Sequence, residues 1–321
     1  MGSIGRRLKH GNILSIIWSC TQISGIIYRE GRVKRIMKMK IFRIVTSLVI
    51  LFGLAGLVGC QAQTQPVPEP VPSDPQAIQT MNVAVYYLKD KNNEMYLVRE
   101  VHKVEKRVEV ARAALHELIS GNPLTSGATK VLPADTKILG IKIENGLATV
   151  DFSGEVLKAN VGSTGEALGI ASIVNTLTEF PTVQQVQFTV DGKAENGMGW
   201  WGHVGLYEQP FKRNLSAVYE PVIWVNSPIA DQTIISPVRI KGNARIFEAM
   251  VSYRLRDADG NILAQGSTMA AAGAPERGDF EAQLSFTPAS VGKGQLEVYE
   301  VSMKDGSEMN MVIVPVQWQS K

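Results

Sequence analysis

The sequence predicts two folded domains of different class: an α+β domain at residues 81–210, followed by an all-β sandwich at residues 221–319. Three observations support this prediction. The chain has 321 residues, which is enough for two domains of ordinary size. In the first part, segments with strand alternation are interspersed with segments of helical periodicity. From Pro221 onward the helical periodicity disappears, and short strand-like segments recur between turns.

The α+β domain is expected to contain two halves, each combining strands with one helix. Residues 105–120 and 163–180 carry apolar side chains at helical spacing. In the second of these helices, Ser163 and Glu166 have the spacing of a capping box. An Asn-Gly pair at residues 145–146 favours a tight hairpin. The expected strands are residues 82–88, 95–101, 137–143, 147–152 and 183–190.

The second domain is expected to be a β-sandwich of about 100 residues, a size that packing alone can stabilise. Its sequence contains no cysteine, so no disulfide can link its two sheets. The expected strands are residues 222–225, 238–242, 249–256, 262–267, 280–286, 295–302 and 311–316.

The segment before the first domain has the features of a lipoprotein signal peptide at residues 37–59. A basic stretch is followed by sixteen uncharged residues, 44–59, which is at or below the length that a spanning helix needs. Leu57-Val58-Gly59-Cys60 resembles the bacterial lipobox, in which the cysteine receives a lipid before cleavage. We therefore expect Cys60 to be the lipidated N-terminus, and the alternative is an uncleaved anchor helix. Either way, the rest of the chain lies outside the cytoplasm, anchored to the cell membrane.

Two further segments flank the signal peptide. Residues 1–36 precede the position at which a signal peptide normally begins, so they are interpreted as an extension from a mis-set start, with Met37 or Met39 as the true start. A genuine N-terminal extension is the alternative. Residues 60–80 contain five prolines and are interpreted as an extended linker between the membrane and the first domain.

The distribution of charge argues against nucleic acid as the partner. The net charge of +3 is due to residues 1–43, which hold 10 Lys or Arg and one acidic residue. Residues 44–321 hold 23 Lys or Arg and 29 Asp or Glu. Binding of phosphates needs clustered cations, which this acidic part of the chain lacks.

Both domains resemble a known family. Residues 82–205 resemble the GerMN, or Germane, domain of sporulation and spore-germination proteins, through YLVREV, ARAALHELISG, LPADTKILGIKIENGLATVDFS, IVNTLTEFPTVQQVQFTVDGK and WGHVGL. Residues 221–316 resemble the immunoglobulin-like domain of bacterial spore-germination proteins, through SPVRIKGNARIFEAMVSYRLRDADGNIL, the turn at 276–280 and LEVYEVSMKDGSEMNMVIVPV. GerM-type members usually have paired GerMN domains, whereas only one is recognised here.

The resemblance implies a non-enzymatic lipoprotein that binds or assembles other components during sporulation or germination. The expected partners are the membrane, through the lipid on Cys60, and envelope or spore-assembly proteins or wall glycan. No catalytic residue, metal ligand or cofactor is implied by the family. The alternatives are a solute-binding or sensing lipoprotein, which needs an apolar pocket with a few polar groups, and a wall hydrolase, which needs two carboxylates facing a cleft.

The candidate partner-contact residues are Trp200, Trp201 and His203, in a glycine-rich segment after the last strand of the first domain. The alternative for the two indoles is packing at the domain junction, and for His203 it is a structural hydrogen bond. Residues 197–202 also satisfy G-x-G-x-x-G, but the sequence after them does not predict the helix that a dinucleotide site needs.

Two acidic patterns in the second domain also have two interpretations each. Residues 257–261, DADGN, have oxygen ligands suited to calcium, but their glycine is misplaced for an EF-hand, so a hairpin turn is expected. Four acidic side chains near strand ends are interpreted as a solvated face, with a basic protein partner as the alternative. They are Glu297, Glu300, Asp305 and Glu308.

Overall fold

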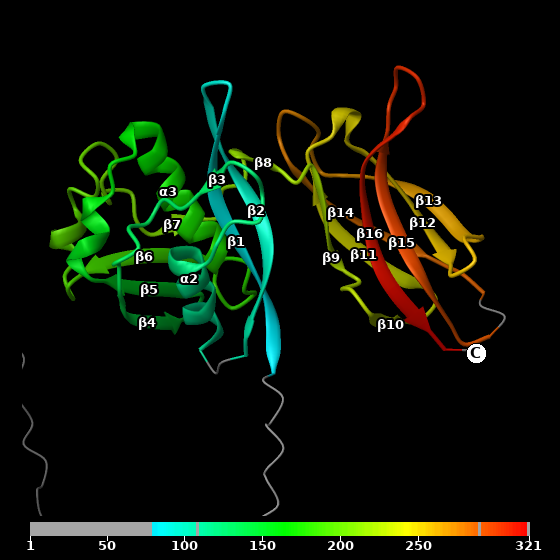
Figure 1. Ribbon diagram of the computed structural model, residues 1–321, viewed down its shortest axis with the longest axis horizontal. Helices are drawn as coiled ribbons and strands as arrows, with labels where there is room; N and C mark the ends of the chain where they lie inside the picture. Colours follow the sequence, from blue (N-terminus) through cyan, green and yellow to red (C-terminus); the bar gives the residue numbers. More distant parts are fainter. Residues whose placement is uncertain (1–78, 107–108, 288–289, 320–321) are drawn as a thin grey trace, which may run out of the picture. The chain divides into compact units, whose positions relative to one another are not determined.

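The computed structural model describes residues 79–106, 109–287 and 290–319. Its ribbon confirms an α+β domain followed by a β domain (Figure 1). The proposed signal peptide, Cys60 and nearly all of the proline-rich linker lie outside the described residues. Among the described helices, none is long and apolar enough to cross a membrane.

The first sheet of the α+β domain is built on a long hairpin. Strands β1 (Thr80–Lys91) and β2 (Glu94–Glu105) pair antiparallel along their whole length, and Asn92 and Asn93 supply the positive φ angles of the turn. Strand β3 (Ala128–Thr129) pairs with β1. Strand β8 (Val218–Glu220) pairs with β2, so this sheet includes residues beyond the expected domain end at residue 210.

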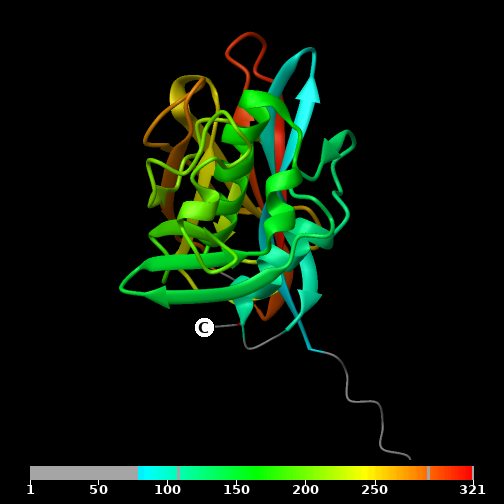
Figure 2. The ribbon, with the colours of Figure 1, turned by 90° about the vertical axis from the view of Figure 1, so that its left-hand side faces the viewer.

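The second sheet of this domain has the order β4-β5-β6-β7. Strands β5 and β6 are parallel because helix α3 (Gly162–Leu177) lies between them in sequence and forms the crossover. Figures 1 and 2 show that its strands run in a different direction from those of the first sheet. The strands are β4 (Ile138–Glu144), β5 (Leu147–Phe152), β6 (Gln185–Val190) and β7 (Phe211–Lys212).

Helix α2 (Val110–Ser120) and helix α3 bury apolar side chains in one core with the two sheets. The expected helix at 105–120 begins too early, because β2 continues to Glu105. The capping box is also wrong: α3 begins at Gly162, and its N-cap residue, Val161, makes no side-chain cap. Three short 3-10 helices complete the described helices: η1 (Gly154–Lys158), η2 (Glu195–Gly197) and η3 (Phe247–Ala249).

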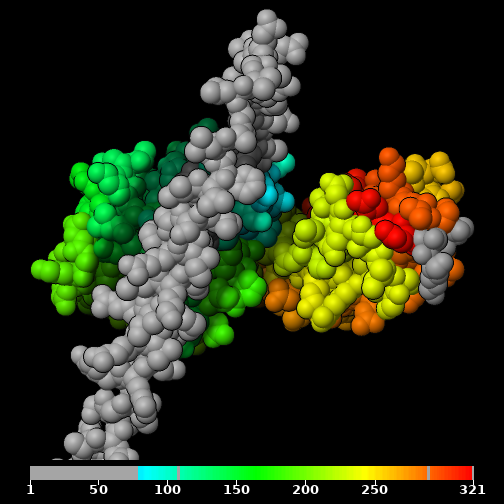
Figure 3. Space-filling model, turned by 90° about the horizontal axis from the view of Figure 1, so that it is seen from below, coloured from blue at the N-terminus to red at the C-terminus, as the bar shows by residue number. Residues whose placement is uncertain are grey.

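The β domain consists of a five-stranded sheet, β10-β16-β15-β12-β13, and a three-stranded sheet, β14-β11-β9. Its surface spans yellow to red in Figure 3. The two sheets enclose a second core that includes Ile240, Leu255 and Leu296. The strands are β9 (Ile223–Ser227), β10 (Gln232–Ile234), β11 (Val238–Ala244), β12 (Met250–Asp257), β13 (Ile262–Met269), β14 (Gly278–Leu284), β15 (Gly292–Val301) and β16 (Glu308–Trp318).

Candidate functional site

The glycine-rich segment after η2 is part of the core. Trp200 is fully buried, with its ring stacked on Phe188 at a centroid distance of 5.5 Å. Trp201 is also buried, and its Nε1 donates to the carbonyl of Val156 at 2.6 Å. A buried indole cannot form an exposed contact surface. This corrects the candidate contact role of Trp200 and Trp201. The indoles are packed, as in the alternative, but within the core of the α+β domain and not at the domain junction.

His203 is the exposed member of this segment. Its side chain is 65% exposed, and its Nδ1 lies 2.7 Å from Oε1 of Glu166, which is itself buried in α3. The other oxygen of Glu166 accepts the backbone N–H of His203 and of Val204. Glu166 therefore fixes the loop after Trp201 and does not cap its own helix. His203 can still meet a partner through the exposed part of its ring.

The two motifs with a ligand-binding interpretation are turns. Residues 197–202 begin at the last residue of η2 and continue through turns, so they do not lead into the helix that a dinucleotide site needs. Asp257 closes the β12–β13 turn by accepting the N–H of Asp259 and of Asn261. Within the ranges that the structure describes, no group of three His, Cys, Asp or Glu side chains could hold a metal ion.

The acidic side chains of the β domain are not all solvated, in contrast to the expectation from the sequence. Glu297 and Glu300 are buried, and Glu297 pairs with Arg254 and with Arg256 across neighbouring strands. Glu308 pairs with the same Arg254. Guanidinium groups of the same sheet neutralise Glu297 and Glu308, and Glu300 accepts the backbone N–H of Phe247 and the side-chain amide of Asn310. These three carboxylates are therefore poorly suited to recruit a basic partner.

A cluster that the sequence did not reveal joins the two domains at Trp224 of β9. The guanidinium of Arg99 in β2 lies 4.9 Å from the centroid of the Trp224 ring, and that of Arg277 lies 4.1 Å from it. Trp224 packs with the core of the α+β domain although it belongs to a strand of the β domain. The Arg99 contact thus connects β2 of the α+β domain to β9 of the β domain, and Arg277, which precedes β14, makes a second cation–π contact with the same indole.

Arg277 also binds the chain that connects the domains. Its Nε donates to the carbonyl of Val218 at 2.6 Å, and its Nη2 donates to the carbonyl of Pro221. Its Nη1 donates to Oδ1 of Asn243 in β11 at 2.8 Å. Burial lowers the pKa of Arg277 to about 9, so it remains protonated at neutral pH. One cation therefore fixes the connection between the domains to β11.

Glu179, which follows α3, anchors Arg99 from the other side. It accepts two hydrogen bonds from Arg99, one from Arg213 at 2.6 Å and one from the hydroxyl of Tyr86. Burial alone would raise the pKa of Glu179, but the guanidinium groups of Arg99 and Arg213 lower it to about 2. The carboxylate is thus ionised throughout the physiological range and holds Arg99 beside Trp224.

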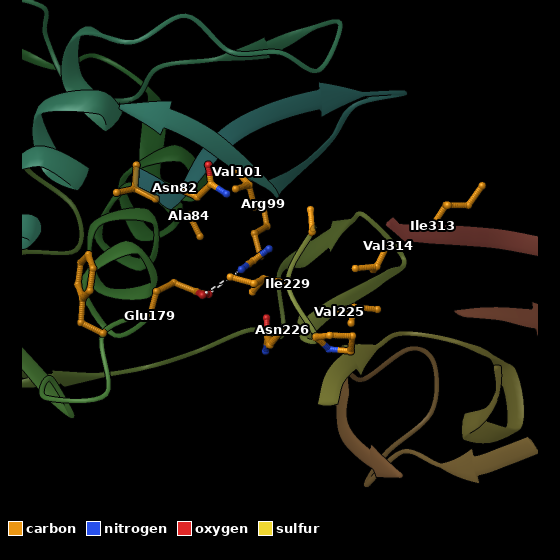
Figure 4. Close-up of a pocket in the computed structure, with 14 residues that line it drawn as sticks. Asn82, Ala84, Arg99, Val101, Glu179, Val225, Asn226, Ile229, Ile313 and Val314 are labelled. Carbon is orange, nitrogen blue, oxygen red and sulfur yellow. Dashed lines mark hydrogen bonds and ion pairs between the residues drawn. The ribbon is translucent and has the colours of Figure 1, made fainter. Parts of the chain in front are cut away.

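A cleft of about 600 Å³ opens beside this cluster (Figure 4). Side chains of β1 and β2 lie along one wall, and side chains of β9, the loop after it and β16 lie along the other. Most of the lining is apolar, as in Val101, Val225 and Ile313. The Arg99 and Glu179 groups reach the cleft, but they are paired with each other.

The comparisons with known proteins agree with this architecture. Residues 84–196 match the family Germane, described as sporulation and spore germination. Residues 222–307 match Gmad2, the immunoglobulin-like domain of bacterial spore germination. The chain therefore carries a Germane domain followed by a spore-germination immunoglobulin-like domain. The junction around Trp224 lies between these two domains.

A curated relative matches part of this chain. The spore germination protein GerM of Bacillus subtilis (strain 168) is 35% identical over 111 residues, which are 33% of this chain and 29% of GerM. The chain thus matches less than a third of the length of this curated relative.

Among solved structures, the tandem GerMN domains of the Bacillus subtilis sporulation protein GerM are 28% identical, with a TM-score of 0.35 over 45% of this chain and 49% of that chain. The first GerMN domain of the same protein is 32% identical, with a TM-score of 0.31 over 35% of this chain and 84% of that chain.

Proposed function

We propose that the protein is a non-enzymatic lipoprotein that binds other envelope proteins during sporulation or germination, tethered outside the cytoplasm through Cys60. The observation that carries the proposal is the covalent joining of two domains that both belong to sporulation and germination families. The buried junction at Trp224 supports a fixed presentation of the pair, because Arg99 and Arg277 engage groups of both domains. Function would then consist of holding two binding surfaces at a set spacing.

The anchor is tested with the variant Cys60→Ala. A diacylated cysteine gives two lipid chains, enough for stable membrane binding, whereas the variant keeps no lipidation site. We expect the wild-type protein to enter the detergent phase of a Triton X-114 extraction and to incorporate labelled fatty acid. The variant should do neither. Ser73→Ala, in the linker, is the control and should behave as wild type. Equal labelling of Cys60→Ala and wild type would overturn the lipid anchor.

A second function, small-ligand binding, is favoured by one observation, the cleft in Figure 4. Its volume of about 600 Å³ is within the range of ligand pockets. Against this function, its charged groups Arg99 and Glu179 satisfy each other and Arg213, so none is left to orient a ligand. Adaptor function therefore remains the preferred proposal, and the wall-hydrolase alternative has no specific observation in its favour.

A further inference from the structure

A buried histidine lies between two carboxylates in the Germane domain. Nε2 of His102 is 2.7 Å from Oε2 of Glu100, on the same strand β2. Its Nδ1 is 2.7 Å from Oε1 of Glu117, on helix α2. The His102 and Glu100 side chains are only 6% and 4% exposed, and that of Glu117 is 22% exposed. We call these three residues the Glu–His–Glu cluster.

The two short contacts require two bridging protons. A neutral imidazole has one N–H and one lone pair, and a carboxylate that faces the lone pair has no proton to share. Both contacts are satisfied when the ring of His102 is doubly protonated, or when the ring is neutral and one of the two carboxyl groups keeps its proton. In either arrangement the folded cluster holds two protons. Losing one leaves two buried acceptors facing each other.

Glu100 also fastens a neighbouring loop. Its carboxylate accepts the backbone N–H of Leu124 at 2.7 Å and that of Thr125 at 2.8 Å. Burial alone would raise the pKa of Glu100, but these N–H groups and the ring of His102 lower it. Thr125 lines a cavity of about 410 Å³ together with Asn310 and Val312 of β16. The cluster therefore holds part of the wall of a cavity beside the domain junction.

Other groups surround the cluster. From β1, the ring of Tyr87 lies 5.6 Å from the ring of His102, and its hydroxyl donates to the backbone carbonyl of Glu117. Burial, followed by the nearby carboxylates Glu117 and Glu100, raises the pKa of Tyr87, so it stays neutral. Glu117 lines a second cavity whose titratable groups come from β2 and α2: Lys103, Glu105, Arg112 and His116.

We propose that the Glu–His–Glu cluster is a proton-dependent lock on the loop at residues 121–127. With both bridging protons in place, Glu100 is held in position to bind the N–H groups of Leu124 and Thr125. When the cluster loses one proton, a bridge is lost, and the loop is released from β2.

The direction of the pH effect follows from counting protons. When the loop and cluster open to water, the three side chains are solvated, and above about pH 6.5 a solvated imidazole is mostly neutral and solvated carboxyl groups are ionised. The open state then holds one proton, and the closed state holds two. The closed state is therefore favoured at lower pH, and the opening constant rises about tenfold for each pH unit above neutrality while the closed cluster keeps both protons.

Hydrogen exchange at Leu124 and Thr125 measures this opening directly, because these amides donate to Glu100. The experiment uses the full-length chain between pH 7 and 8, with rates corrected for intrinsic exchange. For the wild type we expect protection of these two amides to fall about tenfold over this interval. Protection that is independent of pH would overturn the lock.

The variant Glu117→Gln provides the sharpest comparison. Its amide can donate to Nδ1 while neutral His102 donates from Nε2 to Glu100, so both bridges persist with one titratable proton fewer. Protection at Leu124 and Thr125 should then be independent of pH. The matched control is His116→Gln, on the exposed side of the same helix. In this variant, protection should depend on pH as it does in the wild type. If protection still falls with pH in Glu117→Gln, or no longer falls with pH in His116→Gln, the effect belongs to another group.

Discussion

At the scale of single residues, Glu179 is the most heavily bonded carboxylate near the junction. It is held by Arg99, Arg213 and Tyr86. Its pKa is lowered to about 2, which means that the ionised carboxylate stabilises the folded state. An isosteric amide in its place would leave two partly buried guanidinium groups without a counter-charge. Removing one partner of a buried ion pair lowers the stability of the fold, even where the intact pair adds little to it.

We therefore expect Glu179→Gln to lower the free energy of unfolding by about 3 kcal/mol at pH 7. The folded pKa is depressed, so this contribution is complete above the ordinary glutamate pKa of about 4.3 and is lost as the pH falls toward about 2. Urea unfolding at pH 7 and pH 3, followed by Trp fluorescence, measures both points. If the difference in free energy of unfolding between variant and wild type is as large at pH 3 as at pH 7, the stabilisation does not come from the ionised Glu179.

The control is Glu281→Gln. Glu281 pairs with Arg239 and Lys241 on the surface of the β domain, where solvent screens the interaction. Its substitution should change the stability far less than that of Glu179.

At the same scale, the sequence pointed to residues that matter for the structure but did not predict which distant residues they contact. The spacing of Ser163 and Glu166 is that of a capping box, yet Glu166 binds the loop at His203, about forty residues later in the chain. For Trp200 and Trp201 the sequence left open a partner contact or packing, and the structure shows that both side chains are buried. Long-range partners such as Arg277 and Trp224 leave no periodic signal, so the sequence could not pair them.

At the scale of elements, α3 depends on a glycine for its approach to Trp201. A Cβ on Gly169 would collide with the indole of Trp201 and would lie 2.6 Å from the side chain of Val131, closer than real Cβ contacts allow. Alanine normally favours a helix over glycine by about 1 kcal/mol. Here the clash should dominate, because the buried indole is also held by its bond to Val156.

We expect Gly169→Ala to destabilise the Germane domain by about 1 to 3 kcal/mol, measured as a lower urea midpoint with an unchanged slope. Gly199→Ala is the matched control in the neighbouring segment, since a Cβ added there would have nothing within 4 Å of it. It should be nearly neutral. A stabilised Gly169→Ala protein would mean that Trp201 does not pack against α3 as described.

Most elements were predictable because their signals are local. Apolar alternation located the strands of both domains, and the Asn-Gly pair located the β4–β5 hairpin. The helix expected from residue 105 begins only at Val110, because pairing with β1 extends β2 to Glu105, and the sequence pattern alone did not predict that pairing. The short strands β3, β7, β8 and β10 were missed, since two or three residues carry no period.

At the scale of the whole molecule, Arg277 connects the β domain to the chain that enters it. Its hydrogen bonds to the carbonyls of Val218 and Pro221 hold the connecting residues against β11. We expect Arg277→Ala to raise the rate of thermolysin cleavage within residues 213–222 about tenfold, because the carbonyls of Val218 and Pro221 lose their donor. Arg239→Ala, which removes a surface ion pair, should leave the rate unchanged. An unaltered rate in Arg277→Ala would mean that the junction is held by other contacts.

The central claim is that the tethered domain pair acts by binding other envelope proteins. The most direct measurement is in vivo photocrosslinking in sporulating cells, with a crosslinking amino acid at the exposed positions His203 and Ile313, followed by mass spectrometry. We expect discrete, stoichiometric envelope proteins from the wild-type background and their loss with Cys60→Ala. Crosslinks to no protein at either position, with the tethered protein present at normal levels, would contradict the adaptor function.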